Sequence, residues 1–521
     1  MLTFNEIIES FSRITPDKIV VSDEFRNLTY KNLLANGNKL YSYFNSIGLK
    51  KGDRVALLAF NCIEYAEIFY ATSKMGVIIV PINFRFQLKE VIDVWNDAKP
   101  KCFIFQSEFK NIYKNLINKK LINKRYCIII NEKSRREECS YYDKILKDKK
   151  IYIKKSKIKV KILDNWSLLY TSGTTGKPKG VVRNHKGYYL LSAVTAVELS
   201  IKKEDNALIV MPLFHANSFN FFCSYIFSGA SISIYSKKSF EPKHFFNLIK
   251  LNNCNFTSLV PTHYIIILDY IKKNKIKKII TKDFNFMISS APARKDTKRE
   301  ILKYFKSAKL FELYGSSESG WVTMLHPSEQ FKKIGTVGKE CVGSKPILIL
   351  DENKKEVDDE VIGELYACTP YNFSNYWRNT KKTSEAFLND YVTVGDLAFR
   401  TKEGYIKLVD RKNNMIISGG ENIYPAEVEN ILGSHHKIKD VAVIGSSDKK
   451  WGEVVCAFVV PEKGCELKEE NIIKWTKSRL AKYKCPKKVI FLPEKKMPRN
   501  STGKILHKEL RLMIKKTSKN E

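Results

Sequence analysis

Apolar and polar positions alternate along the chain in two ways that predict different elements. From Arg54 onward, short apolar runs are separated by segments whose apolar residues recur every three to four positions. Short runs are typical of buried strands, and the longer spacing is typical of amphipathic helices. The pattern predicts, in chain order, a strand at Val55–Phe60, a helix at Glu64–Met75, a strand at Val77–Pro81, a helix at Leu88–Ala98 and a strand at Cys102–Gln106. Such alternation indicates a layered α/β domain.

The pattern weakens in one segment and changes character in another. Ile112–Lys161 is irregular and very basic, and we expect a surface excursion there. After the polar stretch Arg411–Asn414, the sequence predicts a helix from about Ala426, strands at Val441–Gly445 and Val454–Val460, and a helix from Glu469. We therefore predict a large domain over residues 1–410 and a small α+β domain over 411–521, which is a plausible domain size.

Composition narrows the class of protein. The chain has 521 residues, of which 44% are hydrophobic, so it can bury a large core. Met1–Arg13 lacks the basic and apolar regions of a secretory signal, and no window approaches the roughly 18 apolar residues of a membrane span. The 11 cysteines include no C-x-x-C pair, and the eight histidines show no zinc spacing. We expect a cytoplasmic protein with reduced thiols and no structural metal.

The formal net charge of +35 has two interpretations. A basic surface can attract nucleic acid or an anionic membrane. We interpret the lysines, however, as spread along the whole chain among Ile and Asn residues, with the densest run from Lys110 to Lys161. Such a spread indicates a bias in residue usage rather than a binding surface. No nucleic-acid-reading module and no platform of stacking aromatics is found, so we expect no nucleic-acid partner. Peripheral membrane contact through the basic surface stays open as an alternative.

The strongest chemical signal is a loop that follows the apolar run Trp166–Tyr170. Its hydroxyl groups and glycines offer N–H and O–H donors with little bulk, and its lysines add positive charge. Such a loop can wrap polyphosphate oxygens, although its spacing is not that of a Walker A motif. The residues that we assign to nucleotide binding here are Thr171, Ser172, Gly173, Thr174, Thr175, Gly176, Lys177 and Lys179.

This loop resembles the signature of the adenylate-forming superfamily, which includes acyl-CoA synthetases, peptide-synthetase adenylation domains and luciferases. Further motifs of the superfamily follow in the same order, namely Tyr314-Gly315-Ser316-Ser317-Glu318, Gly395-Asp396-Leu397, the segment Asp410–Glu429, and Pro498–Lys504. The resemblance covers nearly the whole chain. It implies a large layered α/β N-terminal domain and a small, mobile α+β C-terminal domain.

The resemblance also implies roles for individual residues. Glu318 would bind Mg²⁺, for which a hard carboxylate oxygen is suited. Asp396 would accept the ribose hydroxyls, Arg411 would reach the ribose or a phosphate, and Lys504 would bridge the substrate carboxylate and the α-phosphate. The residues that would border the adenine and the α-phosphate are Glu312, Leu313, Tyr314, Gly315, Ser316 and Ser317, the last standing where the family usually has Thr.

The second half-reaction depends on another part of the resemblance. The pair Gly419-Gly420 would border the pantetheine tunnel, because glycine lets the backbone approach a ligand closely. The hinge of the family is usually Asp or Lys, and here it is Asn413. These features imply a ligase that uses ATP and Mg²⁺ to form an acyl-adenylate and then transfers the acyl group to CoA. The compact spacing between Gly395 and Gly420 favours CoA over a carrier protein as the acceptor.

The acid is less well specified. His215 stands where CoA ligases often have a histidine that gates the acid site. Ser218–Phe222 and Val260–Tyr264 would line an apolar cavity, although three phenylalanines in one helix can equally be plain core. We expect a medium- or long-chain fatty acid, and hence a role in lipid metabolism. An aryl acid or a carnitine- or crotonobetaine-type acid is the alternative. An acyl-AMP ligase that loads a carrier protein and an inactive binding protein are remote ones.

Overall fold

The computed structural model describes residues 1–131, 138–149, 151, 158–171, 178–276, 283–290, 295–419, 421–448, 450–500, 503 and 505–517. The chain divides into two compact units. Unit 1 comprises Met1–Ile334, Gly338–Pro346 and Ala367–Val392, and unit 2 comprises Gly335–Val337, Ile347–Tyr366 and Thr393–Glu521. A mobile domain that begins at residue 411 stays a prediction.

Unit 1 contains two large sheets, each with a parallel centre. Within the described residues, the first has eight strands, in the spatial order β19 (Asn375–Tyr376), β9 (Lys179–Asn184), β8 (Asn165–Thr171), β4 (Ile78–Pro81), β3 (Arg54–Leu58), β5 (Cys102–Gln106), β6 (Cys127–Ile130) and β7 (Ser140–Tyr141). The second has nine strands over the same part of the chain, in the order β16 (Lys339–Glu340), β15 (Gly320–Leu325), β14 (Lys309–Ser316), β13 (Asn285–Ser289), β12 (Phe256–Leu259), β10 (Asn206–Ile209), β11 (Ser231–Ile234), β1 (Ile19–Ser22) and β2 (Asn27–Thr29).

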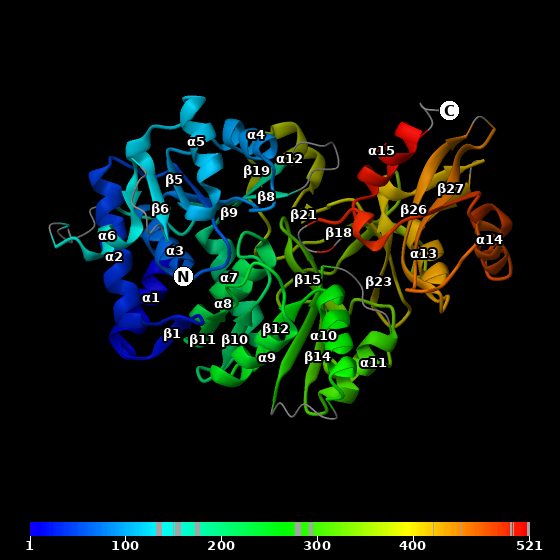
Figure 1. Cartoon of the computed structure of the whole chain (residues 1–521), viewed down its shortest axis with the longest axis horizontal. Coiled ribbons are helices and arrows are strands. Elements are labelled where there is room, and N and C mark those ends of the chain that lie inside the picture. The colour runs from blue at the N-terminus through cyan, green and yellow to red at the C-terminus, as the bar shows by residue number, and fades with distance from the viewer. Residues whose placement is uncertain are drawn as a thin grey trace. The chain divides into compact units, whose positions relative to one another are not determined.

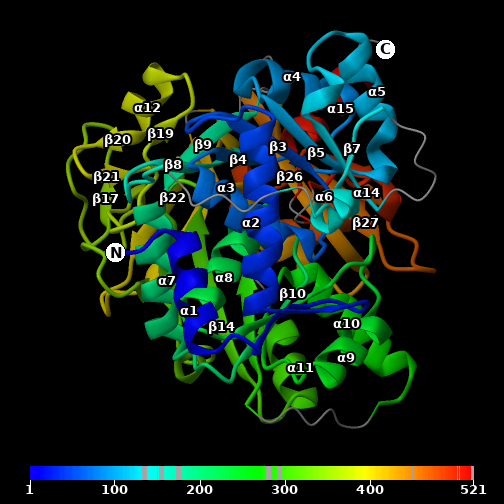
Figure 2. The same cartoon turned by 90° about the vertical axis from the view of Figure 1, so that its left-hand side faces the viewer.

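Helices cover both faces of these sheets (Figures 1 and 2). Between the sheets lie α1 (Phe4–Ile14), α2 (Tyr30–Ser46), α3 (Glu64–Met75), α6 (Tyr142–Lys147), α7 (His185–Leu199) and α8 (Ala216–Phe227). The outer face of the first sheet carries α4 (Leu88–Ala98) and α5 (Lys110–Asn118), and that of the second carries α9 (Pro242–Leu251), α10 (Pro261–Lys273) and α11 (Lys295–Tyr304). Unit 1 also contains α12 (Thr380–Ala386), β20 (Phe387–Leu388) and β21 (Tyr391–Val392). The layered α/β prediction is confirmed.

The side chains of β3 show how the layers form. Val55 and Leu57 join the core between the sheets, whereas Ala56 and Leu58 join the core under α4 and α5. Because successive strand residues point to opposite faces, a strand that is apolar throughout must be covered on both sides. The predicted helices α3 and α4 and the predicted strand β5 have the expected bounds.

The interpretation of residues 112–161 as an irregular excursion is wrong for its described part. Strand β6 is fully buried and pairs in parallel with β5, and β7 pairs with β6. Its sequence, Cys-Ile-Ile-Ile, is a short apolar run. The surrounding lysines hid this strand because they dominate the composition of the segment.

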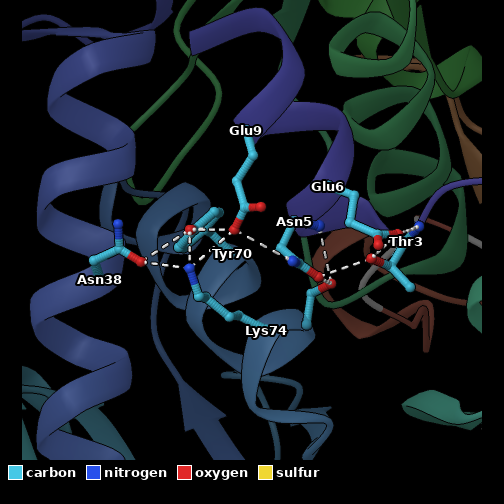
Figure 3. A network of polar contacts seen from close by, with 8 residues as sticks. Thr3, Asn5, Glu6, Glu9, Asn38, Tyr70 and Lys74 are labelled. Carbon is cyan, nitrogen blue, oxygen red and sulfur yellow. Dashed lines mark hydrogen bonds and ion pairs between the residues drawn. The ribbon is translucent and has the colours of Figure 1, made fainter. Parts of the chain in front are cut away.

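Polar side chains join α1, α2 and α3 (Figure 3). The Lys74 ammonium donates to the Glu9 carboxylate at 2.9 Å and to the Asn38 side-chain oxygen at 2.8 Å. The Tyr70 hydroxyl also donates to Glu9, at 2.8 Å. A partly buried charge is stable only when it is paired and hydrogen-bonded, and this network meets that condition. It fixes the N-terminal helix on α3.

Within its described residues, unit 2 contains two mainly antiparallel sheets and a core of its own. One sheet has the order β17 (Leu348–Leu350), β18 (Gly363–Tyr366), β22 (Asp396–Arg400) and β23 (Ile406–Arg411). The other has the order β25 (Glu421–Ile423), β24 (Ile416–Ser418), β27 (Gly452–Pro461) and β26 (Ile438–Asp448), with β28 (Lys488–Phe491) parallel to β27. Helices α13 (Pro425–Gly433) and α14 (Glu469–Lys477) cover one face of the second sheet, and α15 (His507–Thr517) covers the other. The α+β prediction is confirmed for this part.

Candidate functional site

The hairpin of β8 and β9 carries the predicted phosphate loop. Thr171 and Lys179 face each other across the two antiparallel strands and mark the points where the loop leaves and rejoins the sheet. The ammonium group of Lys179 lies 5.1 Å from the centre of the Tyr376 ring. The loop residues Ser172, Gly173, Thr174, Thr175, Gly176 and Lys177 lie outside the described residues. The sheet thus fixes the two ends of the loop.

A tight hairpin between β14 and β15 presents Glu318. A Cβ atom on Gly315 would lie 2.1 Å from the carbonyl oxygen of Gly320, so no other residue fits at Gly315 without moving the backbone. The Ser316 hydroxyl accepts a hydrogen bond from the backbone N–H of Ser319 at 2.9 Å. The neighbouring Leu313 is buried in the core between the sheets. The predicted motif therefore builds a rigid turn.

Tyr376 holds the Glu318 side chain. Its hydroxyl donates to Oε1 of Glu318 at 2.7 Å, and both residues are largely buried. Among the described residues, Oε2 of Glu318 has no hydrogen-bond or ion-pair partner. A hard carboxylate oxygen in this position fits one ligand of Mg²⁺, which takes its other ligands from phosphate oxygens and water. The sequence did not single out Tyr376, which lies 58 positions from Glu318.

A buried arginine lies on β9 close to the same turn. Arg183 is 1% exposed, and it donates to the carbonyl oxygen of Tyr371. Burial lowers the pKa of the Arg183 guanidinium, whereas the neighbouring Tyr188, Tyr371 and Glu318 raise it. Its buried positive charge is partly balanced by the negative charge of Glu318. The sequence analysis missed Arg183 too, because a lone arginine in a strand carries no signal of its own.

Glu312, which the resemblance assigns to the adenine site, has a structural partner. It lies on β14 and forms an ion pair with Lys298 of α11, and the two side chains are only 6% and 3% exposed. A buried carboxylate of this kind needs a paired charge. The sequence did not distinguish Lys298 from the many other lysines of the chain. Tyr314 and Ser317 lie in or next to the same hairpin, as the motif predicts.

The predicted acid site lies at the carboxyl ends of the parallel strands of the second sheet, where open α/β sheets bind ligands. His215 precedes α8, and burial together with the charge of Arg85 lowers its pKa to about 3. The Asn217 amide donates to the Ser289 hydroxyl at 3.1 Å, and that hydroxyl lies 3.1 Å from the Ser258 hydroxyl. The described side chains at these strand ends are therefore partly polar.

The predicted apolar wall is corrected. Phe219, Phe221 and Phe222 are fully buried and belong to the core between the sheets. Phe219 stacks on Phe69 with ring centres 4.2 Å apart, and Phe221 lies 5.0 Å from the Trp321 ring. These three side chains have no surface left to offer an acyl chain. The sequence left the two roles open because core and cavity walls are both apolar.

The structure describes some of the predicted site residues of unit 2 but not all of them. Asp396 and Arg411 face each other on β22 and β23, and the Arg411 Nε atom lies 3.1 Å from an Asp396 oxygen. Gly419 has a φ of +59°, and a Cβ atom there would lie 2.7 Å from the Trp451 ring, so both backbone and space require glycine. The carbonyl oxygen of Asn413 accepts hydrogen bonds from Arg511 at 3.3 Å. Gly420 and Lys504 lie outside the described residues.

The basic residues are not spread evenly, contrary to the interpretation drawn from the sequence. Residues 110–161, 242–309 and 462–521 contain the whole excess of basic over acidic side chains. The rest of the chain has 39 basic and 39 acidic residues. In the part of the chain that the structure describes, no helix is long and apolar enough to cross a membrane.

The chain matches known proteins over nearly its whole length. It matches the family model of the AMP-binding enzyme over residues 8–377 and that of the AMP-binding enzyme C-terminal domain over residues 427–504. It is 30% identical to a long-chain-fatty-acid–CoA ligase, FadD13, of Mycobacterium tuberculosis, over 93% of this chain and 92% of that one. It is 27% identical to a 2-succinylbenzoate–CoA ligase of Bacillus cereus, over 96% of each chain.

Solved structures of other proteins are also similar to this chain over nearly its whole length. The o-succinylbenzoate CoA synthetase MenE of Bacillus subtilis, in complex with its acyl-adenylate intermediate, has a TM-score of 0.84 and 26% identity over 97% of each chain. ATP-bound MatB of Rhodopseudomonas palustris has a TM-score of 0.86 and 26% identity over 98% of this chain and 99% of that one. A fatty acyl-CoA synthetase of Mycobacterium tuberculosis has a TM-score of 0.75 and 26% identity over 99% of each chain.

Proposed function

Because this chain belongs to the AMP-binding enzyme family and is an AMP-forming acid–thiol ligase that uses ATP, Mg²⁺ and CoA, we propose that its acid is a medium- or long-chain fatty acid. The observation that supports the activity is the arrangement of Lys179, Tyr376 and Glu318, in which the carboxylate that we propose as the Mg²⁺ ligand lies beside the end of the phosphate loop. The fatty acid is supported by the 30% identity to a long-chain-fatty-acid–CoA ligase.

The proposed reaction needs positive charge where the substrate carboxylate meets the α-phosphate of ATP. A substrate carboxylate must approach the α-phosphate of ATP, and both groups are anionic. Mg²⁺ at Glu318 would neutralise the phosphate oxygens, and Lys504 would bridge the two anions. Tyr376 would keep the Glu318 side chain oriented. Positioning and electrostatics then account for the step, as they do in phosphoryl transfer.

The two half-reactions have different needs, and we propose that unit 2 contributes to both. In adenylation it would supply Lys504. For thioester formation, the part of the chain that follows Asn413 would turn about this residue and present the loop that begins at Gly419. The left-handed backbone of Gly419 and its close packing on Trp451 support a loop that is built for close approach. Hinges of this kind consist of a few residues that absorb the backbone rotation.

A second candidate acid is an aromatic acid with a further polar group, such as 2-succinylbenzoate. One observation favours it, namely the hydrogen-bonded set Asn217, Ser289 and Ser258 at the carboxyl ends of β12 and β13. Polar groups at a binding site discriminate strongly when the substrate satisfies them. The burial of Phe219, Phe221 and Phe222 in the core also removes the aromatic wall that would have suited an alkyl chain.

Acid-dependent AMP formation with ATP, Mg²⁺ and CoA separates the two candidates. The panel would contain alkyl acids from acetate to long chains, aryl acids, 2-succinylbenzoate and a carnitine-type acid. We expect the highest kcat/KM with medium or long alkyl acids, and mass spectrometry should identify the acyl-CoA product. Turnover confined to 2-succinylbenzoate or another aryl acid would keep the ligase and reject the fatty acid. Lys504→Ala is the control that should abolish turnover with every acid.

We further propose that the outer face of α9, α10 and α11 rests on anionic membranes. These helices cover one face of the nine-stranded sheet (Figure 1), and they contain seven exposed basic side chains but three acidic ones. Leu251, Ile265 and Ile266 are 71%, 45% and 38% exposed among these charges. Apolar side chains within a basic surface suit an interface with anionic lipid, because burial of the apolar side chains and attraction between the opposite charges both favour binding.

Vesicle sedimentation tests this surface. We expect the protein to bind vesicles that contain phosphatidylglycerol and to bind pure phosphatidylcholine vesicles much less, with the difference reduced at high salt. Ile265→Ser with Ile266→Ser should weaken binding while leaving turnover of a soluble short-chain acid unchanged. Val197→Ser, which changes an exposed residue of α7, is the matched control. Equal binding of all three proteins would contradict the proposal.

A further inference from the structure

The segment 369–377 joins the two parts of the site that the sequence motifs define. Its backbone N–H groups at Ser374 and Trp377 donate to Val182 and Gly180 of β9, at 2.9 and 2.7 Å. Its N–H at Phe373 donates to the carbonyl oxygen of Glu318 at 2.7 Å. The segment is therefore fixed to the phosphate-loop hairpin on one side and to the Glu318 turn on the other.

Tyr376 is the side chain of this segment that reaches both parts. It lies on β19, where it pairs with Val181 of β9, and it is 5% exposed. Its hydroxyl donates to Oε1 of Glu318, and its ring lies under the ammonium group of Lys179 at 5.1 Å. A cation over a tyrosine ring is attracted by the negative face of the ring. Tyr376 thus touches the cation at the end of the phosphate loop and the carboxylate at once.

We propose that Tyr376 is a positioning residue that couples nucleotide binding to metal binding at Glu318. This inference rests on the proposed role of Glu318 as the Mg²⁺ ligand. The hydroxyl occupies Oε1 and fixes the carboxylate plane, so that Oε2 is presented to the metal. The ring holds the Lys179 ammonium group close to the Glu318 carboxylate, where the phosphates that carry the metal would bind. A ligand held by an outer partner binds its metal more tightly than a ligand that rotates freely.

The test compares ATP affinity with and without metal by calorimetry, which does not depend on turnover. For the unaltered protein we expect tighter binding of ATP in Mg²⁺ than in EDTA. Tyr376→Phe removes one oxygen atom and keeps the ring under Lys179. It should lower the affinity in Mg²⁺ by about tenfold to a hundredfold, as loss of a hydrogen bond to a charged group does, and leave the affinity in EDTA unchanged.

Two further variants distinguish the outcomes. Tyr371→Phe removes another buried hydroxyl of the same segment, one that donates to the Trp321 carbonyl at 2.8 Å, and it should leave the ratio of the two affinities unchanged. Glu318→Gln should abolish the Mg²⁺ enhancement. If Tyr376→Phe matches the unaltered protein, or if Tyr371→Phe lowers the ratio equally, the inference is overturned. If Glu318→Gln itself keeps the full enhancement, the metal assignment fails and the inference fails with it.

Discussion

Replacing Lys298 by Met removes the positive charge of the buried pair with Glu312 and keeps an unbranched side chain. The two side chains are 3% and 6% exposed, so water cannot take the place of the lost partner. Removing one member of a buried ion pair costs about 3–5 kcal/mol, because the remaining charge stays buried. Whole domains are stable by only about 5–15 kcal/mol, so this loss is a large share of the stability of unit 1.

Urea unfolding of unit 1, followed by tryptophan fluorescence, measures this loss. Lys298→Met should lower the free energy of unfolding by about 3 kcal/mol or more, and adding Glu312→Leu should recover most of it, since well-packed apolar pairs replace buried ion pairs at little cost. Lys303→Met, which changes an exposed lysine of the same helix, should shift the value by less than about 0.5 kcal/mol. The reasoning is refuted if Lys298→Met is no worse than Lys303→Met, or if the added Glu312→Leu deepens the loss.

Other perturbations give equally specific expectations. Gly315→Ala should lower the affinity for ATP in Mg²⁺ at least tenfold, because the new Cβ would lie 2.1 Å from the Gly320 oxygen and the Glu318 turn must move; unchanged affinity by calorimetry would show that the turn tolerates a side chain. His185 is 2% exposed and stacks on Trp166, and burial lowers its pKa from 6.5 to about 3. Below pH 6.5 the unfolded chain therefore takes up a proton that the folded chain does not, and stability falls as the pH drops from 6.5 toward 3, by about 1 kcal/mol per pH unit from this group. His185→Phe should reduce that slope in urea unfolding between pH 6.5 and 4.5, and equal slopes in the two proteins would contradict the assignment. Asn413→Pro should spare adenylate formation and impair thioester formation in single-turnover assays; equal loss of both steps would argue against a pivot there.

Some of the fold could be predicted from the sequence because the pattern of burial is regular. Helices α3 and α4 and strand β5 have the expected bounds, since each has one clear period of apolar residues. Strand β6 was missed because four apolar residues stand in a very basic segment. A local pattern of apolar residues predicts a helix or strand only where the composition of the surrounding segment does not obscure that pattern.

The candidate site was predicted only in part. The motifs identify Glu318 and the ends of the phosphate loop, because these residues lie within short continuous stretches. Tyr376 could not be found in this way, since its contact with Glu318 forms only when β19 pairs with β9. The sequence also assigned Glu312 to the nucleotide, and nothing in the sequence revealed its partner Lys298. Pairings between distant segments depend on the sheet order, which the motifs do not contain.

Exchange of labelled pyrophosphate into ATP in the absence of CoA tests the central claim most directly. An enzyme that forms an acyl-adenylate reverses its first half-reaction without the thiol, so exchange should require the acid, Mg²⁺ and Glu318 but not CoA. Glu318→Gln and Lys504→Ala should each reduce the exchange rate by at least about a hundredfold, the scale seen when a key electrostatic group is removed. Exchange that occurs only when CoA is present, or that continues unchanged in Glu318→Gln, would contradict the account.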